Sequence, residues 1–484
     1  MADNTVRTRY APSPTGFMHV GNLRTALYEY LVAKSQNGKF VLRIEDTDRE
    51  RLVEGAVDVI YDTLSLAGLK HDEGPDVGGD YGPYVQSERK DMYLPYAEQL
   101  IAEGKAYRCF CTKERLEQIQ SENVGGGYDR HCRDLPQEEI DRLLAEGTPY
   151  VIRQKMPIDG KTTFTDAVFG EITVDNCELQ DQILIKTDGY PTYNFANVID
   201  DHTMGITHVV RGCEYLSSTP KYNLLYEAFG WEIPTYVHLP LIMGKNEDGT
   251  VSKLSKRHGA TGFADLIQEG YLPQAIINYI ALLGWCPKDN REIFTLSELE
   301  KEFDISGISK SPSVFDYDKL TWLNGEYIRS MSLEEFTEIA MPYFRSACGD
   351  KEFDFMKIAA ILHQRVTVLN QIPQMIDFFA ELPEYDKELF YNKKSKTTPE
   401  NSPEMLGAVY QKLKELPQWD AQQIHDALIS LAQEKEVKNG TVMWPARIAA
   451  AGKAVTPGGA VEILDILGRE ESLRRLETGL NKLS

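Results

Sequence analysis

Hydrophobic and polar residues alternate in two short segments near the start of the chain. In residues 6–10 every second residue is Val, Thr or Tyr with an arginine between, and residues 40–45 alternate in the same way. Between these segments, residues 23–33 place Leu, Ala and Tyr at helical spacing. The patterns predict a strand, a helix and a second strand, which is typical of neighbouring strands in a parallel sheet. Ligands bind such sheets at the carboxyl ends of the strands.

The pattern changes at about residue 107, where short strand-like segments separated by Asp-Gly turns begin. These segments lie at residues 150–155, 171–174 and 183–186. Parallel-sheet patterns return at residues 207–211 and 237–243. We therefore predict an α/β fold, in which an α+β segment is inserted between two halves of a doubly wound, Rossmann-like parallel-sheet domain.

The rest of the chain has helical periodicity. We predict helices over residues 264–283 and 296–303, the second capped by Ser297 with Glu300. An all-helical C-terminal domain follows, with a second capping box of Ser332 and Glu335 near its start. The expected domain boundaries are 1–106, 107–190, 191–260, 261–327 and 328–484.

Composition narrows the class of protein. The 484 residues are too many for one core, and no apolar run approaches the roughly 20 residues of a membrane span. The first residues lack a signal-peptide pattern, and seven cysteines without framework spacing indicate reduced thiols. We expect a cytoplasmic protein without membrane contact. The net charge of −22 argues against general affinity for nucleic acid, so RNA would have to meet local basic clusters.

The first candidate motif is the turn before the predicted helix, which holds His19 and Gly21 after a Pro-Ser-Pro-Thr-Gly segment. A glycine lets a nucleotide approach the backbone, and a helix start binds phosphates. A histidine there supplies a donor while charge moves to a leaving group. The alternative is a structural turn with a surface histidine.

The second motif is the basic loop Lys253-Leu-Ser-Lys256-Arg257. Phosphoryl chemistry without a protein nucleophile depends on positioning and charge neutralisation, which lysines supply. Residues 244–250 before it form an Asn/Asp/Gly turn, consistent with a loop that moves. The alternative is a solvated basic face.

A third group joins Cys109 and Cys111 with Cys132, which has His131 beside it and Asp134 after it. Zinc takes four N, S or O ligands, so three thiolates with His131 or Asp134 would suffice. The alternative is a set of reduced cysteines that binds no metal.

The His19 turn and the Lys253–Arg257 loop together resemble the paired nucleotide-binding motifs of class I aminoacyl-tRNA synthetases. Longer sequence segments resemble those of the bacterial glutamyl-tRNA synthetases. The resemblance covers roughly residues 5–330 and runs through Arg9-Tyr-Ala-Pro-Ser-Pro-Thr-Gly, Leu42-Arg-Ile-Glu-Asp-Thr-Asp-Arg, Gly189-Tyr-Pro-Thr-Tyr-Asn, Asp200-Asp-His-Thr-Met-Gly and Lys253-Leu-Ser-Lys-Arg-His-Gly.

The resemblance implies ligation of L-glutamate to tRNA(Glu) in two steps, through a glutamyl-adenylate, with ATP and Mg²⁺ and as a monomer. In that reading His19, Gly21 and Lys256 contact ATP, and His19, Lys253 and Lys256 act in catalysis. Activation of glutamate is expected to wait for tRNA. The bound zinc of some relatives would fall on the three cysteines and Asp134.

The resemblance also implies the glutamate site. Arg9, Tyr193 and Arg211 match positions that bind the two carboxylates, Glu45 matches one that holds the ammonium, and Ser13 belongs to the same site. Such a ligand suits guanidinium forks and one acidic partner. The implied RNA-binding parts are residues 107–190 for the acceptor stem, 261–327 for further stem contacts and 328–484 for the anticodon, where Arg365 is a candidate contact.

The chain departs from the family pattern at four places. Asn22 stands where the pattern has a second histidine, and the loop reads Lys-Leu-Ser-Lys-Arg with both lysines kept. Cys213 replaces an acidic residue of many relatives, and Asp134 replaces a zinc-ligand histidine.

Four alternatives compete with this reading. A non-discriminating enzyme would also charge tRNA(Gln) with glutamate. A short paralogue lacks an anticodon domain, unlike this chain with its long segment after Tyr327, and a glutaminyl enzyme would have a barrel-like C-terminal part. An inactive RNA-binding relative would have lost His19, Lys256 or Arg9, which are all present.

Overall fold

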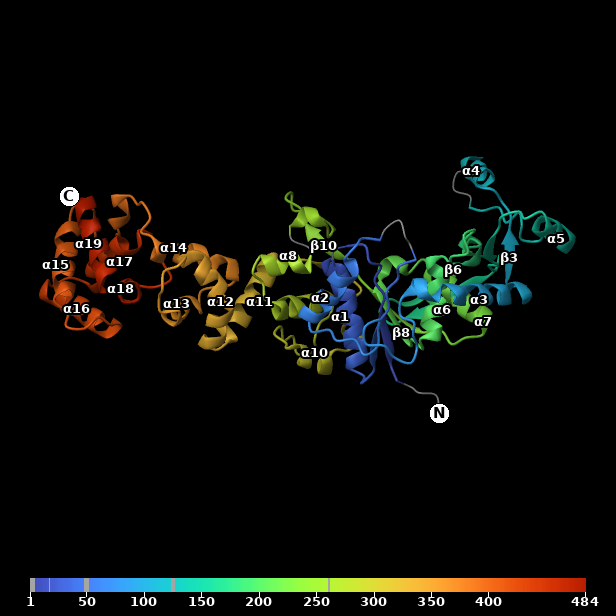
Figure 1. Ribbon diagram of the computed structural model, residues 1–484, viewed down its shortest axis with the longest axis horizontal. Helices are drawn as coiled ribbons and strands as arrows, with labels where there is room; N and C mark the ends of the chain where they lie inside the picture. Colours follow the sequence, from blue (N-terminus) through green and yellow to red (C-terminus); the bar gives the residue numbers. More distant parts are fainter. Residues whose placement is uncertain (1–4, 17, 48–51, 123–126, 260–261) are drawn as a thin grey trace. The chain divides into compact units, whose positions relative to one another are not determined.

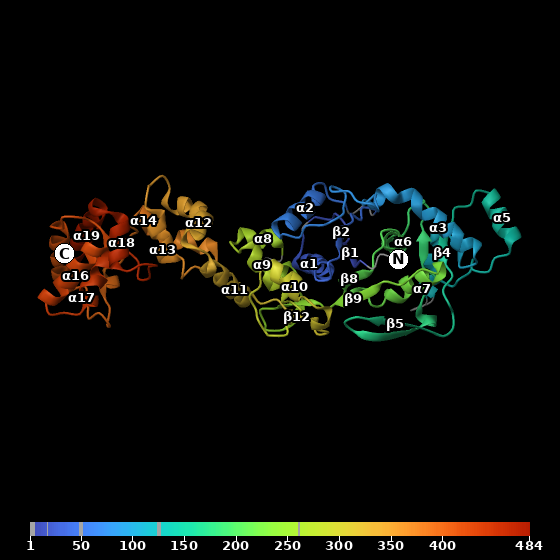
Figure 2. The same ribbon diagram turned by 90° about the horizontal axis from the view of Figure 1, so that it is seen from below.

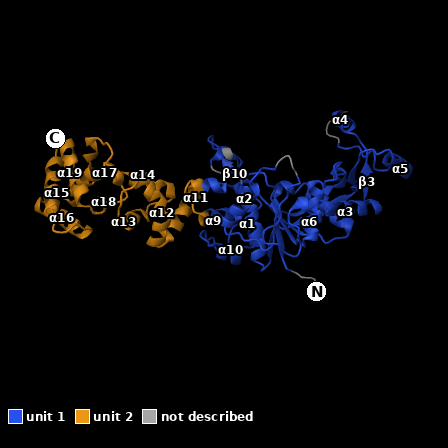
Figure 3. Cartoon of the chain, in the orientation of Figure 1, with its two compact units in different colours: residues 1–266, 276–316 blue, residues 267–275, 317–484 orange. Residues whose placement is uncertain are grey.

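A computed structural model describes residues 5–16, 18–47, 52–122, 127–259 and 262–484. The chain divides into two compact units, coloured separately in Figure 3. Unit 1 comprises Met1–Leu266 and Ile276–Asp316, and unit 2 comprises Ile267–Ala275 and Tyr317–Ser484. Within the described residues, no helix is both long and apolar enough to cross a membrane.

Unit 1 contains the predicted strand, helix and strand. Strands β1 (Arg7–Tyr10) and β2 (Lys39–Leu42) pair in parallel, with Thr8 opposite Phe40, and α1 (Val20–Lys34) connects them. Strand β8 (His208–Gly212) continues the arrangement beside β1, because the backbone N–H of Thr207 donates to the carbonyl of Arg7 at 3.0 Å. The predicted parallel pairing is confirmed.

A four-stranded sheet has the order β6-β5-β9-β8, and Figure 2 shows β5, β9 and β8 side by side. Its other members are β5 (Lys161–Asp166), β6 (Gly170–Asp175) and β9 (Thr235–Leu239). A separate antiparallel sheet consists of β3 (Ala106–Cys109), β4 (Val151–Gln154) and β7 (Ile183–Ile185). A third small sheet consists of β10 (Ile242–Lys245), β11 (Val251–Lys253) and β12 (Ser313–Val314). The sequence pattern missed β3, β5, β11 and β12, and the segment expected over 237–243 is the end of β9 and the start of β10, which belong to different sheets.

Helix α1 is buried on nearly every side, so its polar residues do not form a solvated face. Arg24 donates to the carbonyls of Leu283 and Pro240, and Glu29 accepts from Arg9. These internal partners explain why polar residues are tolerated in a helix that lies in the core.

The other helices before residue 317 are α2 (Ala56–Leu66), α3 (Lys90–Ala102), α4 (Lys113–Glu122), α5 (Gln137–Ala145), α6 (Tyr193–Thr203), α7 (Thr219–Phe229), α8 (Phe263–Gln268), α9 (Pro273–Ala281) and α10 (Leu296–Glu302). The bounds of α8, α9 and α10 correct two of the predictions made from the sequence. The helix expected over 264–283 is two helices, because Gly270 has a left-handed φ of 91° and Pro273 starts the second. The capping box of α10 is Thr295 with Glu298.

Unit 2 is helical, as predicted, and contains no β-strand in residues 317–484. Its helices, seen in Figure 1, are α11 (Tyr317–Ser330), α12 (Leu333–Cys348), α13 (Phe355–Leu362), α14 (Ile372–Ala380), α15 (Ser402–Lys414), α16 (Ala421–Glu434), α17 (Asn439–Ala451), α18 (Ala460–Leu467) and α19 (Arg469–Leu483). The capping box of Ser332 and Glu335 is confirmed. Leu406, Val409, Ile424 and Leu428 are fully buried in one apolar core.

Candidate active site

The His19 turn opens directly into α1. His19 is the N-cap residue of the helix, with extended backbone, and its Nδ1 accepts from the N–H of Gly21 at 3.1 Å. The first turn of α1 carries no acidic side chain. Unpaired N–H groups and the positive end of the helix dipole therefore face the space before the helix, which favours an anion there.

A cavity of about 340 Å³ lies at this helix start. Its walls come from segments far apart in sequence: His19, Gly21, Asn22, Arg24, Thr25, Gly212, Glu214, Pro240, Leu241, Ile242, Lys253 and Leu254. The structure thus brings the first motif and Lys253 of the basic loop to one site. Lys256 begins a short 3₁₀ helix, Lys256–His258, but its side chain lies outside the described part of the chain.

The basic loop follows the β10–β11 hairpin, whose turn agrees with the predicted Asn/Asp/Gly turn. The N–H of Asn246 donates to the carbonyl of Thr250 at 2.8 Å, and Gly249 has a left-handed φ of 82°. His258 at the end of the loop lies 2.9 Å from the Asn246 side-chain oxygen and caps the turn at Ser255. The hairpin and the lysine loop are therefore tied together by side-chain hydrogen bonds.

Arg9 and Glu45 belong to one buried ionic cluster, which also contains Glu29, Arg43 and Asp201. Arg9 pairs with Glu29 and with Asp201, each at 3.0 Å. Arg43 pairs with Asp201 at 2.7 Å and with Glu45 at 2.9 Å. Among the described residues Arg9 thus uses Nη1 and Nε, which leaves Nη2 for another partner.

This cluster holds three carboxyl groups against two guanidinium groups. Burial raises the pKa of Glu29 well above its ordinary value, although Arg9 opposes the shift. Burial also raises the pKa of Glu45, against the influence of Arg43. Oε2 of Glu29 is buried without a hydrogen-bond partner among the described residues. The cluster therefore holds one more carboxyl than guanidinium, and either a proton on one of the glutamates or an ammonium group of a ligand would balance it.

Arg211 lies at the end of β8 and is 5% exposed. Its guanidinium lies over the rings of Tyr222 at 4.5 Å, Tyr236 at 5.1 Å and Tyr215 at 5.2 Å. It forms no ion pair with a described carboxylate, and its Nη1 is buried without a hydrogen-bond partner among the described residues. A buried, unpaired guanidinium is costly, and a ligand carboxylate would satisfy it.

Tyr193 lies close enough to both the ionic cluster and Arg211 to interact electrostatically with each of them. Burial raises the pKa of its hydroxyl well above the ordinary value, the nearby charge of Glu45 adds to this, and Arg211 opposes it. The hydroxyl also influences Arg9 electrostatically. At the same time 39% of the residue is open to solvent, so a ligand can reach it. Arg9, Glu45, Tyr193 and Arg211 therefore lie around one region, and Gly212 joins it to the cavity at His19.

The remaining predicted residues lie elsewhere. Ser13 is exposed in the segment between β1 and α1, where its carbonyl accepts from the N–H of Thr15. Arg365 is exposed in the turn after α13 of unit 2.

The three cysteines form a compact group, since their sulfur atoms all lie within 4.8 Å of one another. Hydrogen bonds from Cys132 and Tyr128 lower the pKa of Cys109, so one thiolate is favoured there. The Tyr128 hydroxyl lies 3.2 Å from the sulfur of Cys109 and 3.7 Å from that of Cys111. Asp134 instead pairs with Lys155 at 3.0 Å, and its side chain is 80% exposed.

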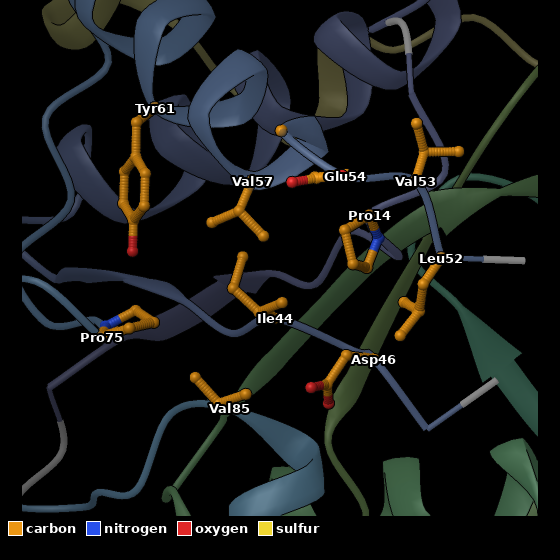
Figure 4. A pocket seen from close by; sticks show the side chains of 11 residues that line it. Pro14, Ile44, Asp46, Leu52, Val53, Glu54, Val57, Tyr61, Pro75 and Val85 are labelled. Atoms are coloured by element: carbon orange, nitrogen blue, oxygen red, sulfur yellow. The ribbon is translucent and has the colours of Figure 1, made fainter. Parts of the chain in front are cut away.

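A second cavity of about 380 Å³ lies beside the end of β2 and is shown in Figure 4. Pro14, Ile44, Leu52, Val57 and Val85 make it largely apolar. Asp46 and Glu54 are its acidic members, and both carboxylate oxygens of Asp46 already accept from Ser87, at 2.7 and 2.6 Å. No residue predicted for the site lines this cavity.

Sequence reasoning assigned no role to Glu29, Arg43, Asp201, Tyr128 or His238. Asp201 stands in the Asp200-Asp-His-Thr segment used for the family resemblance, which was the available signal. Arg43 stands in the Leu42-Arg-Ile-Glu segment used in the same way, whereas Glu29, Tyr128 and His238 carry no local pattern that separates them from surface residues.

Comparison with known proteins agrees with this geometry. Residues 5–322 match the family described as tRNA synthetases class I (E and Q), catalytic domain, and residues 335–480 match the anticodon binding domain family. A glutamate–tRNA ligase of Clostridium botulinum is 59% identical over 484 residues, which cover 99% of each chain. That of Clostridium tetani is 57% identical over 487 residues, covering 100% of this chain and 99% of the relative.

The crystal structure of a glutamate tRNA ligase from Elizabethkingia meningosepticum, in complex with its amino acid, superposes with a TM-score of 0.91 at 38% identity. The match covers 99% of this chain and 100% of the other. Fold and site thus define a class I aminoacyl-tRNA synthetase with a helical anticodon-binding part, as the sequence predicted. Within that class, the chain belongs to the family of glutamate–tRNA ligases.

Proposed function

We propose that the two regions described above divide the substrates of glutamate–tRNA ligation between them. The observation that carries this proposal is Arg211, a buried guanidinium whose Nη1 has no partner among the described residues. A carboxylate of glutamate occupies that position, with Tyr193 beside it. The ammonium group of glutamate lies at Glu45 and supplies the charge that balances the cluster. Arg9 offers Nη2 to the same ligand, and Ser13, four residues further along the chain, is a further contact.

ATP occupies the cavity at the start of α1. Its phosphates meet the N–H groups of the helix start, His19 and Lys253, and Gly21, which lines the cavity without a side chain, lets the nucleotide approach the backbone. Lys256 reaches the transferring phosphate from the basic loop. Glu214, the carboxylate among the lining residues, would hold Mg²⁺ together with the nucleotide phosphates, and the ion would supply charge neutralisation.

The reaction follows from this placement. An oxygen of the glutamate α-carboxylate attacks the α-phosphorus of ATP, and the bond from that phosphorus to the pyrophosphate oxygen breaks. His19, Lys253 and Lys256 stabilise the charge that moves to pyrophosphate. A hydroxyl of the terminal tRNA ribose then attacks the carbonyl carbon of the adenylate, and AMP leaves with the bonding electrons.

For the RNA we propose that residues 107–190 bind the acceptor stem, 261–327 contact the stem further, and 328–484 bind the anticodon with Arg365 as one contact. The match of residues 335–480 to the anticodon binding domain family supports the last assignment. Charging of tRNA(Glu) alone, by a cytoplasmic monomer, is the simplest form. Assays with tRNA(Gln) and size determination in solution test these two points.

We also propose that Cys109, Cys111 and Cys132 hold a structural zinc ion. The donor set fits, because three thiols converge and one is inclined to ionise. Tyr128, rather than Asp134, faces the thiols and completes the set. Metal analysis of Tyr128→Phe and Asp134→Ala separates the two: zinc content should fall in the first and persist in the second. The opposite pattern would restore Asp134 as the ligand.

ATP–pyrophosphate exchange with glutamate and with glutamine, each with and without total tRNA, tests the proposal as a whole. Exchange with glutamate only in the presence of tRNA is expected. Exchange with glutamine at a similar rate would overturn the assignment of Arg9 and Arg211 to the two carboxylates of glutamate. Exchange with glutamate in the absence of tRNA would overturn only the expected tRNA dependence and would leave the rest of the proposal in place.

A further inference from the structure

Two neutral side chains accept hydrogen bonds from the guanidinium group of Arg211. Its Nε donates to Nε2 of His238 at 3.1 Å, and its Nη2 donates to Oγ1 of Thr219 at 2.7 Å. Nη1, the remaining nitrogen, has no partner among the described residues. Two of the three nitrogens therefore fix the plane of the guanidinium, while the third stays available to a ligand.

The contact with Arg211 defines the protonation of His238. A guanidinium can only donate, so Nε2 of His238 must be the acceptor and its proton must lie on Nδ1. Nδ1 lies 2.6 Å from Oδ2 of Asp166, which accepts that proton in a hydrogen bond. Burial lowers the pKa of His238, although Asp166 opposes this, and the neutral ring required by the geometry is thereby favoured.

Both carboxylate oxygens of Asp166 accept hydrogen bonds. Oδ1 accepts from the N–H groups of Val168 and Phe169 at 2.9 and 2.8 Å, and Oδ2 accepts from the backbone and ring of His238. Burial acts to raise the pKa of Asp166, but its hydrogen bonds with His238 and Phe169 outweigh burial and the pKa is lowered. A fixed carboxylate of this kind can select one tautomer of the ring.

Asp166 comes from a different part of the chain than the arginine it supports. It is the last residue of β5, whose single register pair with β9 is Asp166 opposite Tyr236. His238 lies on β9, and Arg211 lies opposite it on β8. Three neighbouring strands thus place an acid, an imidazole and a guanidinium in one row.

We propose that Asp166 and His238 are positioning residues that orient Arg211 for the carboxylate of glutamate. The inference rests on the proposed role of Arg211. A buried Asp–His pair carries a desolvation cost that apolar side chains of similar volume would avoid. What apolar side chains cannot provide is an acceptor for Nε of Arg211, which would then be free to rotate toward other partners.

Steady-state aminoacylation by the full-length chain with tRNA(Glu) tests the proposal. Two variants of His238 are compared, one that preserves a group near Nδ1 and one that preserves a group near Nε2. His238→Asn keeps a donor near Nδ1 but removes the acceptor at Arg211. His238→Gln places an acceptor near Nε2 but loses the bond to Asp166. We expect His238→Asn to raise KM for glutamate about tenfold, the effect of losing one hydrogen bond to a charged donor, with KM for ATP unchanged.

His238→Gln is expected to keep KM for glutamate near that of the parent chain. Asp166→Asn presents a donor to Nδ1, moves the ring proton to Nε2 and should match His238→Asn. His208→Asn, on β8 and bonded to Thr207, is the matched control and should leave KM for glutamate unchanged. Equal defects in His238→Asn and His238→Gln, or an equal rise of KM for ATP, would overturn the proposal in favour of a packing role.

Arg211→Lys separates this inference from the proposed function. An unchanged KM for glutamate in Arg211→Lys would remove the role of Arg211 and the inference with it. A raised value there, beside a normal value in His238→Asn, would overturn only the inference. The nitrogen chemical shifts of ¹⁵N-labelled histidines in the parent chain need no variant to fold: a buried neutral ring protonated on Nδ1 is expected, and protonation of His238 on Nε2 would overturn the proposal.

Discussion

The two units differ in what they bury. Unit 1 contains a cluster of Arg9, Glu29, Arg43, Glu45 and Asp201 with almost no exposed surface. The core of unit 2 consists mainly of Leu, Ile, Phe and Ala side chains. Apolar burial stabilises roughly in proportion to area, whereas a buried ion pair often does no better than an apolar replacement. The charges of unit 1 therefore contribute geometry at the proposed substrate site, and the apolar core of unit 2 contributes stability.

Unit 2 has one informative exception. Arg475 is fully buried, and its Nη1 donates to the carbonyls of Phe378 and Ala450 at 2.7 and 2.8 Å. These carbonyls lie in the last turns of α14 and α17, where helix carbonyls lack intrahelical partners. The guanidinium of Arg475 in unit 2 thus binds free carbonyls at helix ends, while the charges in unit 1 surround the proposed ligand position.

The largest effect is expected from Arg43→Met. The change leaves Asp201 and Glu45 buried without the guanidinium that pairs with both, so we expect unit 1 to lose about 3–5 kcal/mol of unfolding free energy. Urea denaturation measures it. Arg142→Met removes the exposed ion pairs of α5 and is the control, with no measurable change expected. A stable Arg43→Met chain would mean that the cluster is not needed for folding.

Leu428→Ala tests how much one buried apolar side chain contributes to the unfolding free energy of unit 2. Leu428 is fully buried in the helical core, and truncation should cost about 2–5 kcal/mol through lost burial and the cavity left behind. Gln433→Ala, at an exposed position of α16, is the control. KM for glutamate should not change in either variant. A shift in that KM would show that the units are not independent in function.

Lys256→Ala tests a charge of unit 1 that we propose to act in catalysis and that does not belong to the core cluster. We expect adenylate formation to slow by about 10²-fold or more, as removal of a transition-state charge contact does, with unfolding free energy unchanged. Pyrophosphate exchange in the presence of tRNA measures the rate, and Lys245→Ala on the preceding hairpin is the control. Near-normal exchange would remove Lys256 from the mechanism.

The same contrast explains what could be predicted from the sequence. Periodic apolar residues revealed the helices of unit 2 and the strand, helix and strand of unit 1, because burial of one face leaves a repeating pattern. Arg9 and Asp201 are 192 residues apart, and no local pattern pairs them. Glu29 and Arg24 on α1 look like a solvated helix face in the sequence. Strand β5, which carries Asp166, was missed because its Lys-Thr-Thr-Phe-Thr-Asp text has one large apolar residue.

The smallest effect concerns two helix starts, one predicted correctly and one not. Oγ of Ser332 accepts from the N–H of Glu335 at 3.1 Å, and Oγ1 of Thr295 accepts similarly from Glu298. Replacing either with Ala should cost about 1 kcal/mol. Ser297 was the residue chosen from sequence, yet its expected partner Glu300 instead accepts from the Tyr30 hydroxyl at 2.5 Å.

Ser297→Ala should therefore cause no loss of stability, since Ala suits a helix interior at least as well as Ser. Thermal unfolding of the three single variants compares them directly. A loss in Ser297→Ala equal to that in Thr295→Ala would show that α10 begins where the sequence pattern placed it. An effect confined to Thr295 and Ser332 would confirm that α10 begins at Leu296, an arrangement in which the Tyr30 hydroxyl engages the carboxylate that the alternative box requires.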